Sequence, residues 1–73
     1  MRYYIIDNLG SLVRTGRRGE PSSLNLEHDN RHHADYFHTK EAANTRLLYW
    51  IANNDFKGRV ISEQDGREMV EGF

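Results

Sequence analysis

Apolar residues in the segment 36–56, YFHTKEAANTRLLYWIANNDF, recur at the spacing of an amphipathic α-helix. Thr39 fits as the N-cap, because its hydroxyl can accept a hydrogen bond from an amide of the first turn. Asn53 tolerates the left-handed conformation that ends helices. The pattern therefore predicts one long helix, with a core on one side only. The predicted buried face consists of Ala43, Leu47, Leu48, Trp50 and Ile51. The borders and the opposite side carry Lys40, Asn44, Thr45 and Arg46.

Residues 2–7 alternate in the manner of a β-strand rich in aromatic and β-branched side chains. Tyr3 and Ile5 would lie on one face, and Tyr4 and Ile6 on the other. Since both faces are apolar, we expect a central strand, covered by the helix on one side and partly by aromatic rings or a partner on the other. Residues 8–10 form a turn signal that leads into a second strand over residues 11–15.

Three further strands are predicted around the helix. Residues 32–37 alternate and run into the helix, residues 59–63 contain Val60 and Ile61, and residues 64–66 give a hairpin signal before a last strand over residues 67–70. The order β-β-loop-β-α-β-β predicts a single α+β domain over residues 1–73. We expect two layers, with an antiparallel sheet of four to five strands and one helix on one face. The other face, with its tyrosines, would be a dimer interface, a partner interface or solvated.

Residues 16–31, GRRGEPSSLNLEHDNR, predict a long loop, because they contain two glycines, the only proline and no sustained periodicity. Connections longer than about 12–15 residues without secondary structure are uncommon in compact domains, and they are usually functional or disordered. Two interpretations stay open at this point. The loop is either a solvated insertion or an ordered binding element.

The length and the net charge of the chain limit the classes of protein to which it can belong. A chain of 73 residues has room for one small core, so self-association, for example as a homodimer, would help to bury more surface. The absence of cysteine fits a reducing cytoplasm. No segment predicts a signal peptide or a bilayer span, so no membrane partner is expected. The net charge of −1 argues against a protein that binds nucleic acid mainly by neutralising phosphates.

Four arginines flank the predicted loop, and arginine can bind carboxylates or phosphates through two parallel hydrogen bonds. The alternative is a solvated charge cluster. Tyr3 and Tyr4 on the open sheet face are candidate partner contacts, but the aromatic and glycine positions do not match an RNA-binding motif of the RRM type. The candidate partner-binding arginines are Arg14, Arg17, Arg18 and Arg31.

Histidines and serines offer residue types found at metal and catalytic sites. The metal candidates are His28, His32, His33 and His38, with Glu27, Asp29 and Asp35 nearby. The chain has no cysteine, no H-E-x-x-H motif and no zinc-finger spacing, so surface histidines are the simpler interpretation. Ser22 and Ser23 lack a G-x-S-x-G context, and so short a chain has little material for a pocket. We therefore expect no cofactor, no metal and no enzymatic activity.

The pattern Tyr3-Ile5-Asp7-Gly10-Leu12, followed by Ala34, Phe37 and Thr39-Lys40-Glu41-Ala42, resembles small bacteriophage and mobile-element accessory proteins over about half the chain. The resemblance implies a non-enzymatic inhibitor or modulator of a host machine, anti-CRISPR and other anti-defence proteins among them, in the cytoplasm of the host cell. The basic loop departs from the acidic surfaces common in such inhibitors.

Three hypotheses follow. The first is a small binding protein that acts on a larger host protein or nucleoprotein complex. The alternative is a nucleic-acid-binding regulator that uses the arginines at positions 14, 17, 18 and 31. The third is a metal-dependent protein built on the histidines.

Overall fold

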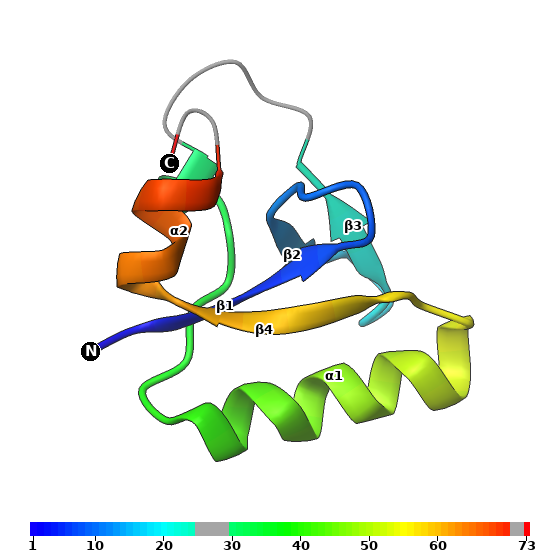
Figure 1. Cartoon of the computed structure of the whole chain (residues 1–73). Helices are drawn as coiled ribbons and strands as arrows, with labels where there is room; N and C mark the ends of the chain where they lie inside the picture. The colour runs from blue at the N-terminus through cyan, green and yellow to red at the C-terminus, as the bar shows by residue number, and fades with distance from the viewer. Residues whose placement is uncertain (25–29, 71–72) are drawn as a thin grey trace.

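The computed structural model describes residues 1–24, 30–70 and 73, which form a small compact α+β domain. In this part of the chain the strands form two antiparallel pairs, β1 with β4 and β2 with β3 (Figure 1). The prediction of one sheet with four to five strands is therefore wrong, because the β2–β3 hairpin pairs with itself and does not extend the β1–β4 ladder. None of the described helices is long and apolar enough to cross a membrane. In chain order the elements are β1 (Tyr3–Asp7), β2 (Val13–Thr15), β3 (Pro21–Ser23), the 3-10 turn η1 (Asn30–His32), α1 (Lys40–Asn54), β4 (Gly58–Ser62) and α2 (Glu63–Met69).

Strand β1 lies at the centre of the domain, as its two apolar faces predicted. Along one edge it pairs with β4, so that Ile5 lies opposite Val60. Along the other edge it makes single bridges, from Tyr3 to Phe37 and from Ile6 to Leu12. The predicted turn over residues 8–10 is present, but the bridge to Ile6 comes from Leu12, just before β2, and β2 itself pairs with β3.

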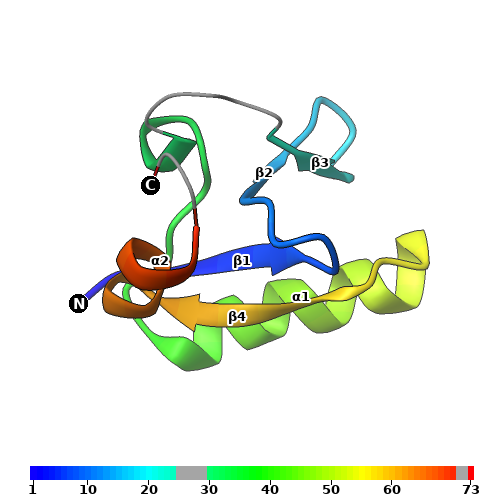
Figure 2. The same ribbon diagram turned by 45° about the horizontal axis from the view of Figure 1, so that its top comes forward.

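Both faces of the β1–β4 ribbon are covered, so the expected open sheet face is wrong. Figure 2 shows α1 along one face, while α2 and the segment before α1 lie on the other. The first face packs Ile5 and Val60 against Trp50 of α1. The second face packs a separate core around Tyr4, whose side chain is only 1% exposed. That core also contains Ile6, Leu12, Leu24, Ala34, Ile61, Val70 and Phe73.

Helix α1 begins as predicted but buries a narrower face. The Thr39 hydroxyl accepts a hydrogen bond from the backbone N–H of Ala42 at 3.1 Å, and Asp55 closes the helix with a left-handed φ of 52°. Only two of its side chains, Ala43 and Trp50, are fully buried. A two-stranded ribbon is too narrow to cover a wide helix face. The predicted burial of Leu48 and Ile51 is therefore wrong, because they are 64% and 44% exposed.

The predicted last strand is a second helix, α2, and its start explains the difference. The Ser62 hydroxyl accepts a hydrogen bond from the backbone N–H of Asp65 at 3.1 Å, which makes Ser62 an N-cap. Arg67 then bonds Glu63 at 2.8 Å, one helical turn away. Residues 64–66, which resemble a hairpin turn in sequence, are thus part of the helix, and the prediction of a single helix is wrong.

The predicted strand over residues 32–37 is also wrong. Only Phe37 pairs with β1, through two backbone hydrogen bonds to Tyr3 at 2.8 and 2.9 Å. Residues 30–32 form η1 instead, and Ala34 turns into the core. The predicted loop over residues 16–31 is ordered in its first half, where β3 pairs with β2, whereas residues 25–29 lie outside the described residues.

Candidate functional site

The β2–β3 hairpin carries two of the candidate arginines at its tip. The backbone N–H of Gly16 donates to the carbonyl of Glu20 at 2.7 Å, and Gly19 has a φ of 82°, a conformation that favours glycine. The backbone N–H of Arg18 donates to a carboxylate oxygen of Glu20 at 2.8 Å. The turn is therefore closed by its own hydrogen bonds, and the side chains of Arg17 and Arg18 remain exposed.

Trp50 fixes this hairpin to α1. Its ring is completely buried, and Nε1 donates to the carbonyl of Gly19 at 2.7 Å. Val13 of β2 packs in the same cluster. Because a buried indole N–H needs a partner, the hydrogen bond to the turn and the packing of the ring reinforce one another. The arginine-bearing turn thus has a defined position relative to α1.

Arg46 connects α1 to two other segments. Its Nη1 donates to the Thr15 hydroxyl at 2.6 Å and lies 3.8 Å from Oδ2 of Asp35. Thr15 donates to the same Asp35 oxygen through both its backbone N–H and its hydroxyl. The guanidinium carbon lies 5.5 Å from the ring centroid of Trp50 and 5.7 Å from that of Phe37, within cation–π range. Arg46 was expected on the solvated border of the helix. That prediction is only partly correct, because the side chain is 38% exposed and also makes these contacts.

A shallow groove lies between the hairpin and α1. We call it the hairpin groove, and it has a volume of about 370 Å³. The Arg46 side chain is 38% exposed, so the groove presents a positioned guanidinium group beside the exposed ring of Tyr49. On the other side of Arg46 is a second depression, which Asp35 lines. The hairpin groove is lined by Thr15, Gly19, Thr45, Arg46 and Tyr49.

The structure separates the four candidate arginines. Arg14 is exposed on β2, but it alternates with Val13 and Thr15 and so points away from the hairpin groove. Arg31 lies in η1, near α2 and away from the β2–β3 hairpin (Figures 1 and 2), with its guanidinium carbon 5.9 Å from the ring of Phe73. Only Arg17 and Arg18 therefore adjoin the groove.

The two candidate tyrosines are not equivalent. Tyr4 is buried and packs edge-on against Phe73 at 5.0 Å, so the prediction that it contacts a partner is wrong. Tyr3 is half-buried beside Phe37. Sequence reasoning missed Arg46 and Tyr49 as residues of a groove. The sequence contained a signal for Arg46, since it precedes Trp50 by one helical turn and lies on the same side of α1.

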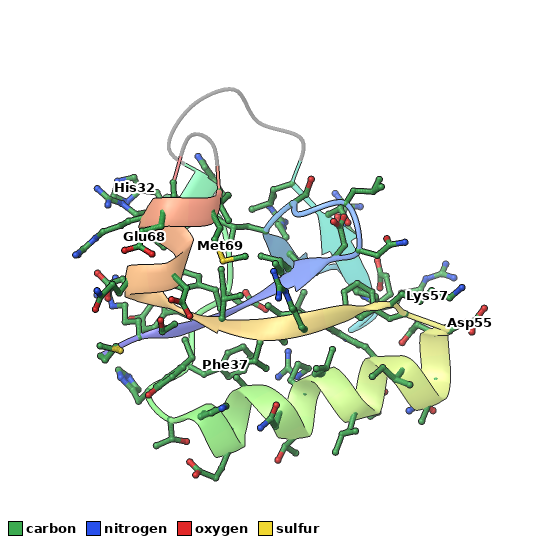
Figure 3. All side chains as sticks on the ribbon, viewed as in Figure 1. His32, Phe37, Asp55, Lys57, Glu68 and Met69 are labelled. Atoms are coloured by element: carbon green, nitrogen blue, oxygen red, sulfur yellow. The ribbon has the colours of Figure 1, made fainter. Side chains whose placement is uncertain are left out.

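The described histidines do not form a metal site. In the part of the chain that the structure covers, no three His, Cys, Asp or Glu side chains lie close enough to hold an ion. His38 packs edge-on against Tyr36 at 5.6 Å, and Figure 3 shows His32 beside the C-terminal end of α2. The candidates at positions 27–29 lie outside the described residues. Of the two serines, Ser23 donates to the Asp7 carboxylate at 2.6 Å and ties β3 to the end of β1.

Comparison of the chain with known protein families, with curated proteins and with solved structures finds no match in any of the three. The surface chemistry of the chain itself is therefore the basis for a function.

We expect Arg46→Ala to lower the free energy of unfolding by about 1 kcal/mol, because it removes charge-assisted hydrogen bonds at a partly exposed site. The midpoint of urea denaturation measures this loss. Arg14→Ala is the matched control, since Arg14 is exposed on the opposite face of β2. Equal midpoints for the two variants would contradict the bracing role of Arg46.

Proposed function

We propose that this protein is a small non-enzymatic binding protein whose hairpin groove binds an acidic segment of a larger host protein or nucleoprotein complex, and that it inhibits or modulates that target. The observation that carries the proposal is a groove that presents the Arg46 guanidinium group beside a turn with two further exposed arginines. Arg46 lines the groove from α1, and Arg17 and Arg18 precede Gly19, the turn residue that lines the other side.

The groove is suited to carboxylates because part of it is already organised. Arg46 is held by Thr15 and by the rings of Trp50 and Phe37, so binding orders little further side-chain freedom there. Tyr49 is 54% exposed at the same groove and offers an amphipathic ring. Arginine and tyrosine are the residues that most often dominate the binding energy of protein interfaces.

Charge favours a protein segment over nucleic acid as the ligand. The net charge is −1, and the structure does not gather the four candidate arginines into one basic track, because Arg14 and Arg31 face elsewhere. Nucleic-acid binding usually relies on several phosphate contacts along a continuous basic surface. Regulation through nucleic acid is therefore the alternative that the experiment below separates from the proposal.

The polar groups beside the groove support a non-enzymatic function, because they already bond to one another. The Thr15 hydroxyl donates to Asp35 and accepts from Arg46. A nucleophile needs a base that takes its proton and an open approach for the substrate. Here both the hydroxyl and the carboxylate serve to join β2 to α1. The resemblance of the sequence to bacteriophage and mobile-element accessory proteins supports a target in a host cell.

The experiment compares wild type with Arg17→Ala/Arg18→Ala on an array of acidic 12-residue peptides, followed by fluorescence anisotropy on the peptides retained. We expect the melting temperature to stay nearly unchanged, because exposed charges contribute little to folding. Peptide affinity should fall by roughly thirtyfold, corresponding to about 2 kcal/mol for arginines central to an interface. The matched control is Arg31→Ala, which removes the arginine that lies away from the groove.

A single-stranded DNA and a single-stranded RNA of the same length are measured alongside. Tight nucleic-acid binding with a steep loss of affinity in salt, and no peptide binding, would favour the nucleic-acid alternative. Peptide binding that is equally strong in wild type and in the double variant would overturn the groove as the binding site.

A further inference from the structure

The outer edge of β4 is open for pairing. Strand β4 bonds to β1 along one edge only, and no other described strand runs along the opposite edge. The backbone N–H of Glu63 donates to the carbonyl of Arg2 at 2.8 Å. This hydrogen bond fixes which residues of β4 direct their backbone groups toward β1 and which direct them outward. The backbone groups of Arg59 and Ile61 therefore point toward β1, and those of Val60 and the N–H of Ser62 point outward, while the Ser62 carbonyl begins helix α2. We propose that two copies of this chain pair antiparallel through β4 and form a dimer.

A two-fold axis at Val60 gives the one register in which all five β4 residues pair. In that register Gly58 lies opposite the partner's Ser62, and Val60 lies opposite its own copy. One position further out, Lys57 faces the partner's Glu63, and the contact occurs twice because the axis repeats it. Opposite charges directly across a strand pair stabilise it. Figure 3 shows Lys57 at the beginning of β4, just after the end of α1.

The position of α1 fits the same assembly. Helix α1 packs against both β1 and β4 on one face of the ribbon. Strands in a sheet lie roughly 4.8 Å apart, so joining two ribbons through β4 would place the two α1 helices about two strand spacings, or roughly 10 Å, apart. Helices that pack directly against each other have axes roughly 8–10 Å apart. The paired copies would therefore bring their α1 helices into contact without any rearrangement.

An exposed apolar residue of α1 lies on the flank that this contact would cover. Arg46 marks the flank facing Thr15, beyond the β1 edge of the ribbon. At about 100° per residue, Ile51 lies roughly 100° around the helix from the buried Trp50 and roughly 140° from Arg46, on the side away from Thr15. Ile51 thus faces the β4 side, where it is 44% exposed, whereas Leu48 lies roughly 160° from Trp50 and points away from the ribbon. An exposed isoleucine beside an unpaired strand edge is a feature that a partner would bury.

A second copy fits this surface better than a foreign strand. The same chain supplies the cation, the anion and the apolar helix flank that its own two-fold copy requires. A domain of 73 residues also gains from burying more surface by association. The hairpin groove lies on the opposite flank of α1, so pairing through β4 leaves both grooves accessible.

The first test is sedimentation velocity of the full chain over a range of micromolar concentrations. We expect wild type to show a reversible dimer and Ile51→Glu to weaken it by at least tenfold, because two carboxylates would enter an apolar helix contact. Tyr49→Glu is the matched control, since Tyr49 is exposed on the same helix but faces the hairpin groove. It should weaken acidic-peptide binding and leave the dimer intact.

The second test reverses the charges across the strand pair. Lys57→Glu and Glu63→Lys should each weaken association by roughly tenfold, and the double variant should recover it, because the attraction is restored with its signs exchanged. Circular dichroism confirms that each variant is folded. Wild type that sediments as a monomer at several hundred micromolar overturns the proposal. So does an equal effect of Ile51→Glu and Tyr49→Glu, or a double variant that associates no better than the single ones.

Discussion

Trp50→Ala is expected to leave the chain largely unfolded at room temperature. Trp50 is completely buried and is the largest side chain of the cluster between α1 and the ribbon. Truncating a buried tryptophan typically costs about 3–5 kcal/mol, and a small domain has only about 5 kcal/mol or slightly more to lose. The variant also deprives the Gly19 carbonyl of its donor, so the hairpin loses its attachment to α1. Far-UV circular dichroism and urea titration measure the effect.

Two further substitutions, one at Tyr49 and one at Trp50 itself, serve as controls for this prediction. Tyr49→Ala removes the adjacent aromatic ring, which is 54% exposed, and should change stability by less than about 1 kcal/mol. Trp50→Phe keeps an aromatic ring but lacks the N–H, so it should fall between wild type and the alanine variant. A cooperative unfolding transition of Trp50→Ala close to that of wild type would show that the cluster is not organised around this residue.

The long helix was readable from the sequence because its signals are local. Thr39 caps the first turn, and Ala43 and Trp50 recur on one face, as predicted. The predicted face was too wide because the sequence does not reveal how broad a surface the helix packs against. Leu48 and Ile51 match the apolar pattern but lie outside the narrow strip of α1 that a two-stranded ribbon covers.

The second helix was missed because two local signals compete in the same segment. Residues 64–66 read as a hairpin turn, yet Ser62 and Asp65 also have the spacing of an N-cap and a first-turn acid. Packing favours the helix, since Gly66 is buried and lies close to the ring of Phe73. That contact depends on the fold of the whole domain, so local propensity does not reveal it.

At the candidate site, too, the features that depend on neighbouring residues were predictable from the sequence, and those that depend on distant residues were not. The exposed Arg17 and Arg18 between two glycines were expected from composition alone. The bracing of Arg46 was not, because its partner Thr15 is 31 positions away in the sequence. Asp35, which accepts from Thr15, lies in a segment whose alternation wrongly predicted a strand. A groove between the hairpin and α1, braced by a third segment at Asp35, is therefore visible only once these segments are folded together.

The two flanks of α1 have different chemistry, and this difference links the two proposals. One flank meets the hairpin and carries Arg46 and Tyr49 at the groove. The other carries the exposed Ile51 beside the open edge of β4. A dimer paired through β4 would hold two grooves on opposite outer sides. If a target carries two acidic segments within reach, such a bivalent arrangement raises the overall affinity without any new contact.

Gly58→Ala is expected to be the second strongly destabilising substitution, with a loss of about 3 kcal/mol. A Cβ at this position would collide with the backbone carbonyl oxygen of Ile6 on the neighbouring strand, and it would also lie 2.6 Å from the ring of Phe56. A backbone atom in a paired strand cannot move aside without disturbing the β1–β4 ladder. The substitution therefore strains the ribbon on which both cores pack.

Gly66→Ala is the matched control for this prediction. A Cβ there would come as close as 2.6 Å to the ring of Phe73, but the contact is with the outer atoms of a side chain, which can shift where a paired backbone carbonyl cannot. Alanine also favours a helix interior by about 1 kcal/mol over glycine, which offsets part of the crowding. Urea midpoints should therefore fall much further for Gly58→Ala than for Gly66→Ala. The reverse order would mean that the contact between Gly58 and β1 is not the tight point of the fold, and the β4 edge proposed for dimerisation would then lose its rigid support.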